Sequence, residues 1–109
     1  MTIDVLRQLT LKSRALHGHR YVLPVALVLG GGPSRAVSAS DVLDHLPGRV
    51  DRPRVLEALQ RLVELEAMDE LPRDDRPNAT RYFTRRDESP YWAFIDAFVP
   101  AAVHAEVDN

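Results

Sequence analysis

Residues 38–73 read SASDVLDHLPGRVDRPRVLEALQRLVELEAMDELPR and contain the clearest secondary-structure signals in this chain of 109 residues. Ser38 and Asp41 have the spacing of a capping box, in which two side chains each accept a backbone N–H at the start of a helix. The pattern therefore predicts a short helix from Ser38 to Leu46. A Pro-Gly pair follows directly and ends it.

A longer helix is predicted from Asp51 to Leu65. Asp51 can cap it, and Pro53 is tolerated in its first turn because an N–H there would have no partner within the helix. Apolar residues then recur at the spacing of one face of a 3.6-residue helix. They are Val55, Leu56, Leu59, Leu62 and Val63.

Two short runs follow and predict a β-hairpin. The first run is Ala67–Leu71 and the second is Thr80–Thr84, which is rich in aromatic and β-branched residues. A polar segment that contains two prolines lies between them, as expected of a turn-rich link between antiparallel strands.

Further helices are predicted on both sides of this region. Before it, Thr2–Leu16 is predicted to form an amphipathic helix. A second helix covers roughly His19–Leu29, with Pro24 near its start or kinking it. Gly18 separates the two. The run from Gly30 to Pro33 ends the second helix, and it has no following Lys-Ser/Thr pair that would make it a phosphate-binding loop.

A last helix begins after Ser89, a good capping residue, with Pro90 as its first residue. Pro100 bends or ends this helix. Four side chains at helical spacing are expected to point inward: Trp92, Ile95, Phe98 and Val99.

A short helix, a tight turn, a longer helix and a hairpin resemble a winged helix-turn-helix. The residues that carry the likeness are 38–73 and the later RYFT at 81–84, and the likeness extends over about residues 20–84. They are similar to the bacterial transcriptional regulators of the MarR, ArsR and PadR types. The resemblance implies a mainly α fold with a small β-hairpin and flanking N- and C-terminal helices.

One winged-helix domain is therefore expected over residues 1–109. It comprises an N-terminal helix at 1–17, a core at 18–86, and a C-terminal helix and tail at 89–109. In the similar families a glycine commonly follows the recognition helix, because the chain turns there in a left-handed conformation. Glu66 stands at that position. Either the turn carries a cost of about 1 kcal/mol, or the helix continues past it.

The resemblance implies double-stranded DNA as the partner, with the recognition helix at 51–65 in the major groove and the wing at 69–84 on the backbone or minor groove. Arginine can donate two hydrogen bonds to guanine, and glutamate can accept one from cytosine. Hydroxyls and helix N-termini suit phosphate. The predicted DNA-contacting residues are Arg35, Ser38, Ser40, Arg52, Arg54, Glu57, Arg61, Arg73, Arg76, Asn78 and Arg81.

A second interpretation stays open at this point. Glu57 and Arg61 are spaced as a helical ion pair, which is equally typical of a face that only contacts solvent. The acidic segments 62–72 and 87–108 would suit a basic protein partner. The alternative function is therefore a winged-helix adaptor that binds protein and not DNA.

Charge and composition limit the function classes. The formal net charge is −2, but residues 1–61 carry nine basic and five acidic side chains, whereas residues after Arg86 carry five acids and no base. Cysteine is absent, which excludes thiol catalysis and cysteine-ligated metals. No catalytic constellation is visible, so an enzyme is not expected, and neither a cofactor nor a metal site is predicted at His17, His19, His45 or His104. The sequence names no effector ligand.

The longest apolar run, Val25–Leu29, is far shorter than the roughly 20 residues that span a bilayer, and the N-terminus lacks the pattern of a signal peptide. A cytoplasmic protein without membrane contact is expected. The apolar faces of the terminal helices predict a homodimer. Its predicted interface consists of Ile3, Leu6, Leu9, Trp92, Ile95 and Phe98.

Overall fold

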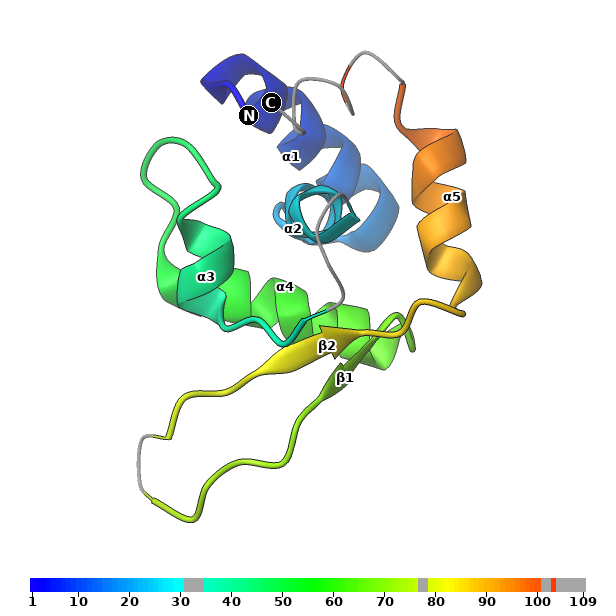
Figure 1. Ribbon diagram of the computed structural model, residues 1–109. Coiled ribbons are helices and arrows are strands. Elements are labelled where there is room, and N and C mark those ends of the chain that lie inside the picture. The colour runs from blue at the N-terminus through cyan, green and yellow to red at the C-terminus, as the bar shows by residue number, and fades with distance from the viewer. Residues whose placement is uncertain (31–34, 77–78, 101–102, 104–109) are drawn as a thin grey trace.

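A computed structural model describes residues 1–30, 35–76, 79–100 and 103. Within these residues the fold is mainly helical, with five helices and one small antiparallel sheet of two strands (Figure 1). The elements in chain order are α1 (Ile3–His17), α2 (Val22–Gly30), α3 (Ala39–Leu43), α4 (Arg52–Glu64), β1 (Met68–Glu70), β2 (Phe83–Arg85) and α5 (Pro90–Phe98).

Local capping explains where four of the helices begin. The Ser38 and Asp41 side chains form the predicted capping box at α3, and Asp51 accepts from the Arg54 N–H at the start of α4. Ser89 caps α5 with Pro90 as its first residue. Thr2 likewise caps α1. The structure therefore confirms the predicted starts of these helices. They could be predicted because each cap depends only on residues within one helical turn.

The start of α2 differs from the prediction, which began this helix at His19. The Ser13 hydroxyl donates to the His19 carbonyl at 2.6 Å and accepts from the Leu23 N–H at 2.9 Å. The His19 ring accepts from the Tyr21 N–H at 3.1 Å. These bonds hold residues 18–21 as a turn, so α2 begins at Val22. Pro24 therefore lies in its first turn, and the predicted stop after Gly30 falls on residues 31–34, outside the described residues.

The predicted helix from Ser38 to Leu46 is also shorter in the structure. α3 ends at Leu43, and residues 44–46 form turns in which His45 and Leu46 bond to carbonyls three residues back. The following turn requires glycine, because Gly48 has a φ of +79° and an added Cβ would lie 2.9 Å from Cδ1 of Ile3.

α4 ends at Glu64, and Glu66 has the left-handed φ of +61°. The Glu66 N–H bonds to the Val63 carbonyl and the Ala67 N–H to the Leu62 carbonyl, both at 2.9 Å. This pair of bonds is a Schellman motif with glutamate in the position that favours glycine. Of the two expectations for Glu66, the turn therefore holds and the longer helix does not.

The hairpin is shorter than predicted and shifted at its second strand. β1 pairs with β2 in the register Met68 with Arg85 and Glu70 with Phe83, whereas the prediction ended the second strand at Thr84. Sequence analysis missed a further pairing: Val37 and Phe83 exchange two backbone hydrogen bonds of 2.8 Å. The segment between α2 and α3 thus borders the sheet.

The core surrounds α2, which is seen nearly end-on in the middle of Figure 1. Its residues from Val22 to Leu27 are all buried. The Trp92 indole closes one end of the core, since its N–H donates to the carbonyls of Ala67 and Arg86 at 3.2 and 3.1 Å. α5 is thereby attached to the base of the hairpin.

The predicted dimer interface needs a correction. Leu6, Leu9, Trp92 and Ile95 are buried in the core of the single chain, so they are not available to a partner. Ile3 and Phe98 are 46% and 40% exposed, and the inward prediction for Phe98 is therefore wrong. None of the helices in the described ranges is long and apolar enough to cross a membrane.

Candidate nucleic-acid interface and a neighbouring groove

The starts of α3 and α4 lie next to each other on the surface. Nη1 of Arg52 donates to the Ser40 hydroxyl at 3.3 Å, which joins the first turns of the two helices. Arg54 is exposed, and its Nε lies 3.6 Å from the carboxylate of Asp51. Ser38 is buried by its capping role, so its hydroxyl is already used within the chain. Of the predicted contact residues, Ser40 and Arg52 are therefore in contact here, and Arg54 belongs to the same first turn of α4.

Farther along α4, Glu57 does not pair with Arg61 as a helical ion pair. Its carboxylate instead lies 3.2 Å from Nε2 of His19, in the turn between α1 and α2. Among the described residues, no carboxylate lies within 4.0 Å of Arg61, which is exposed. The predicted reading face is thus bordered by the α1–α2 turn.

This border forms a hollow of about 370 Å³, which we call the arginine hollow. In the described part of the chain, no carboxylate lies within 4.0 Å of Arg14 or Arg20. An adjacent hollow of about 330 Å³ adds Arg7 to the same surface. The arginine hollow is lined by Arg14, Gly18, His19, Arg20, Tyr21, Arg54 and Glu57.

Arg14 and Arg20 are not among the contact residues predicted from the sequence. The two are separated by the Gly18 turn, so no helical periodicity places them beside Arg54, which is 34 or more positions away along the chain. The only signal was the excess of basic residues over residues 1–61. That excess indicates a positively charged surface but does not predict which arginines lie together in the fold.

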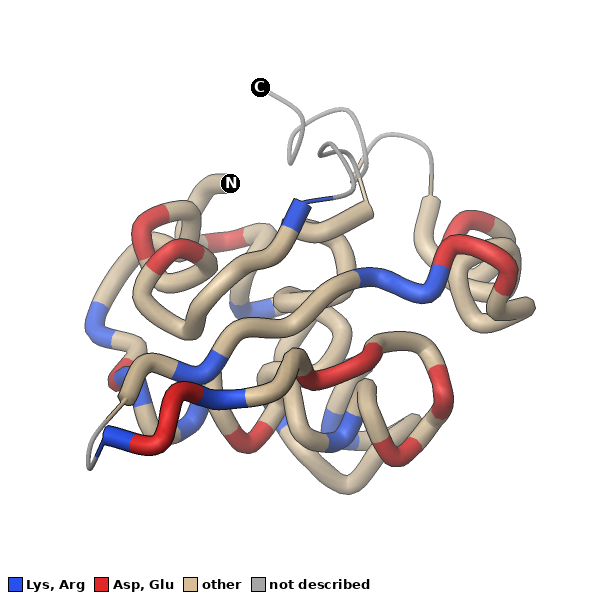
Figure 2. The backbone as a smooth tube through the Cα atoms, turned by 60° about the horizontal axis from the view of Figure 1, so that its bottom comes forward, with Lys and Arg blue, Asp and Glu red and all other residues tan. Residues whose placement is uncertain are grey.

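The hairpin arginines are in a different electrostatic situation. Figure 2 shows basic and acidic positions following one another along the hairpin. Arg81 donates two hydrogen bonds to Glu70 at 2.8 and 2.6 Å, and Arg76 donates to Asp74 at 3.0 Å. Arg73 lies 3.9 Å from Glu70. Each of these predicted wing arginines therefore lies beside a carboxylate of the hairpin, although Arg73 and Arg76 remain exposed. Asn78 lies outside the described residues.

Two further arginines attach the hairpin to the rest of the fold. Arg86 binds the carboxylate of Asp69 through two nitrogens. Arg85 lies 2.9 Å from the carboxylate of Asp87, donates to the Gly30 carbonyl at 3.1 Å, and has its guanidinium 4.3 Å from the Trp92 ring centre. The contacts of both side chains therefore stabilise the fold, and neither guanidinium is directed at the candidate interface.

The pKa directions agree with this pairing. Hydrogen bonds from Arg81 lower the pKa of the Glu70 carboxyl, and those from Arg86 lower the pKa of Asp69. The backbone hydrogen bond at Ser38 lowers the pKa of Asp41, to which the positive charge of Arg35 contributes less. These carboxylates therefore stay ionised at neutral pH.

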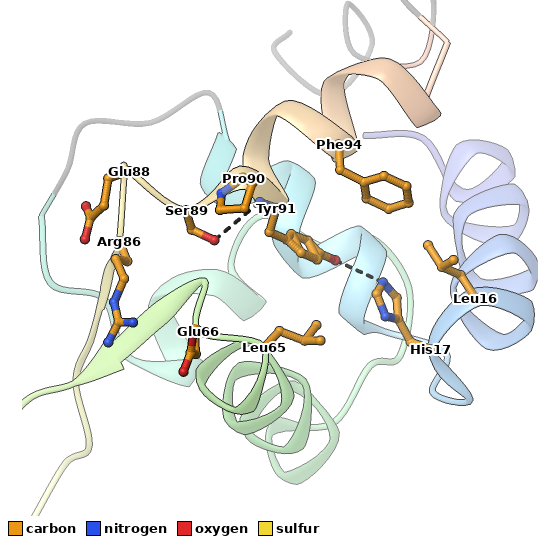
Figure 3. A pocket seen from close by; sticks show the side chains of 10 residues that line it. All are labelled: Leu16, His17, Leu65, Glu66, Arg86, Glu88, Ser89, Pro90, Tyr91 and Phe94. Carbon is orange, nitrogen blue, oxygen red and sulfur yellow. Dashed lines mark hydrogen bonds between the residues drawn. The ribbon is translucent and has the colours of Figure 1, made fainter.

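A separate groove of about 670 Å³ lies between the end of α1, the end of α4 and the start of α5 (Figure 3). The Tyr91 hydroxyl lies 3.0 Å from Nε2 of His17 across it, and the two rings stack at 5.7 Å. Burial lowers the pKa of His17, with Arg61 adding to this effect, and burial raises the pKa of Tyr91. Both side chains are therefore uncharged at neutral pH.

Within the described ranges, no three or more His, Asp or Glu side chains lie together where they could hold a metal ion. Comparisons with protein-family models, with curated proteins and with solved structures find no match to this chain. Fold geometry and charge are therefore the basis for a functional proposal.

Proposed function

We propose that this chain is a sequence-specific DNA-binding transcriptional regulator with a winged helix-turn-helix fold. The order α2, Val37 bridge, α3, α4 and hairpin supports this fold. In such an arrangement α4 is the recognition helix and its first turn approaches the major groove. Arg52 and Arg54 stand in that turn.

The observation that carries the proposal is the distribution of unpaired arginines. Around α4 and the α1–α2 turn, Arg14, Arg20 and Arg61 have no carboxylate within 4.0 Å among the described residues. A surface that neutralises phosphates needs such cations, because the main source of affinity is release of the counterions of the nucleic acid. The net charge of −2 is a sum over the whole chain, and three of its acids, Asp69, Glu70 and Asp74, bind arginines of the same chain.

The distribution of unpaired arginines also changes the set of residues that we propose to contact DNA. We infer that the DNA backbone runs over the arginine hollow, and that Arg73, Arg76 and Arg81 contribute less than the sequence predicts. The adaptor alternative receives less support, because the acids that would face a basic partner include Asp69 and Glu70, which bind arginines internally.

The test is fluorescence anisotropy with a labelled random-sequence duplex over a range of salt concentrations. The wild-type affinity should fall steeply with salt. Each lost phosphate contact should reduce the slope of log K against log salt by about 0.9, so Arg14→Ala/Arg20→Ala should reduce it by nearly two such steps. Arg73→Ala/Arg76→Ala is the matched control and should reduce it less.

Specificity is tested by selecting duplexes from a random pool. Arg52→Ala/Arg54→Ala should abolish enrichment of any sequence, because these side chains are proposed to contact base edges. Absence of binding by wild type at low salt would contradict the proposal and favour the adaptor.

A further inference from the structure

The groove between α1, α4 and α5 has the composition of a small-molecule site. Ligand pockets of about 300–1,000 Å³ have mainly apolar walls and a few polar groups that set orientation, and this groove has a volume of about 670 Å³. Three of its apolar side chains are unusually open to solvent: Leu16, Leu65 and Phe94 are 40%, 45% and 44% exposed. The groove therefore offers apolar surface that the chain itself leaves uncovered.

Charge is concentrated at one end of the groove. Figure 3 shows Glu66, Arg86 and Glu88 on one side of Tyr91 and the apolar Leu16 and Phe94 on the other. Arg86 donates hydrogen bonds from Nε and Nη2 to the carboxylate of Asp69. Glu66 and Glu88 have no cation within 4.0 Å among the described residues, although the positive charge of Arg86 acts on both carboxylates. Since the one charge of Arg86 is shared by Asp69, Glu66 and Glu88, this end of the groove keeps a net negative charge.

The opposite end, at Leu16 and His17, has no carboxylate among its lining residues. Burial lowers the pKa of His17, and the positive charge of Arg61 adds to this effect. The carboxylates at the first end are therefore the groups of the groove that attract a cation. The aromatic faces of Tyr91 and Phe94, which also line the groove, can interact favourably with a cation.

We propose that the groove binds an amphipathic organic cation, with its ammonium group at Glu66 and Glu88 and its apolar body against Leu16, Leu65, Tyr91 and Phe94. An anion fits poorly because the single lining cation, Arg86, is occupied by Asp69. A second copy of the chain is the competing occupant, and the experiment below separates the two.

Such a ligand would also touch the turn that connects α4 to β1. Leu65 and Glu66 belong both to the groove and to the Schellman turn at the end of α4. Occupancy should therefore alter the angle between the proposed recognition helix and hairpin. This consequence for DNA rests on the proposed function, whereas ligand binding itself does not.

The experiment uses three probes with one aromatic body: 2-naphthylmethylammonium, 2-naphthylmethanol and 2-naphthylacetate. Amide chemical shifts of the ¹⁵N-labelled full chain are followed without DNA. The cation should bind about fivefold more tightly than the alcohol, as expected of exposed ion pairs and cation–π contact, and the acetate most weakly. The shifts should centre on Leu65, Glu66, Tyr91 and Phe94, which line the groove.

Variants identify the groups responsible. Glu66→Gln/Glu88→Gln should remove most of the preference for the cation over the alcohol and leave alcohol binding unchanged. Glu64→Gln, exposed on α4 and outside the groove, is the matched control. Phe94→Ala should weaken all three probes. The spectra of each variant report whether it is folded.

Equal or tighter binding of the acetate, or shifts outside the groove, would overturn the proposal. Groove shifts that follow protein concentration and not the probe would assign the groove to a second copy instead. DNA affinity is measured separately with and without the cation. If wild type binds DNA but not the cationic probe, this inference is wrong and the proposed function stands. If wild type binds the cationic probe but not DNA, the proposed function is wrong and this inference stands.

Discussion

Glu66 has an unfavourable backbone conformation at an important junction. Its φ of +61° belongs to the left-handed region, where a side chain with a Cβ is strained. The two hydrogen bonds of the Schellman motif keep it there, since they satisfy the last carbonyls of α4. The residue also lines the groove, so a carboxylate at this position is consistent with a ligand-binding role that a glycine could not perform.

Glu66→Gly should therefore stabilise the fold by about 0.5–1 kcal/mol, because glycine adopts this conformation without strain. Urea unfolding followed by circular dichroism measures the change. Glu64→Gly, in the last turn of α4 itself, should have the opposite sign, as glycine is unfavourable inside a helix. A lower midpoint for Glu66→Gly would show that the side chain contributes more than the strain removes.

At the scale of the elements, the hairpin is held by charge more than by strand length. β1 and β2 have three residues each, and an isolated hairpin of this size is marginal in water. Arg81 compensates by binding Glu70 across the two arms, with its guanidinium 5.6 Å from the Phe83 ring centre. The Arg86–Asp69 pair and the Val37 bridge hold the base.

This arrangement predicts acid sensitivity. The pKa of Glu70 is below its usual value of 4.5, so its stabilising contribution is complete above that pH and is lost as the pH falls through the folded-state pKa. Between pH 5 and 3, wild type should lose about 1 kcal/mol more stability than Glu70→Gln. Glu64→Gln should behave like wild type in urea unfolding over the same range. Parallel acid curves for wild type and Glu70→Gln would contradict this role of the pair.

At the scale of the whole molecule, the terminal helices have divided roles. Their inner faces complete the core of the single chain, through Leu6 and Leu9 on α1 and Trp92 and Ile95 on α5. Their outer faces still expose apolar residues: Ile3 packs near Gly48, while Phe94 and Phe98 stack at 5.5 Å. A dimer, if it forms through these helices, must use the outer residues alone.

The homodimer therefore stays a prediction, and its proposed interface is reduced to the exposed residues Ile3 and Phe98. Size-exclusion chromatography with light scattering should give the dimer mass at micromolar concentration, and Phe98→Asp should give a monomer. Tyr82→Ser removes a similarly exposed aromatic residue from the hairpin and should remain dimeric. A monomeric wild type would remove the prediction, along with the expectation that two α4 helices contact successive turns of DNA.

Much of the fold could be predicted from the sequence because its signals are local. The caps at Ser38, Asp51 and Ser89 act within three residues, and the apolar stripe of α4 repeats every turn. The strand ends were less accurate, because short strands are defined by their partners. For Glu66 the sequence leaves two conformations open, and in the structure the two hydrogen bonds of the Schellman motif hold the strained one.

The order of the helices and the hairpin can be predicted from the amino-acid sequence alone. Helix caps and the spacing of apolar residues both depend on residues close to one another along the chain. Which charges are paired follows from the folded arrangement of the chain. It joined Arg81 to Glu70 across the hairpin, brought Arg14 and Arg20 beside Arg54, and buried Leu6 and Trp92 in the core of one chain. The physical reason is that ion pairing and burial depend on distances between residues far apart along the chain, which no local pattern specifies.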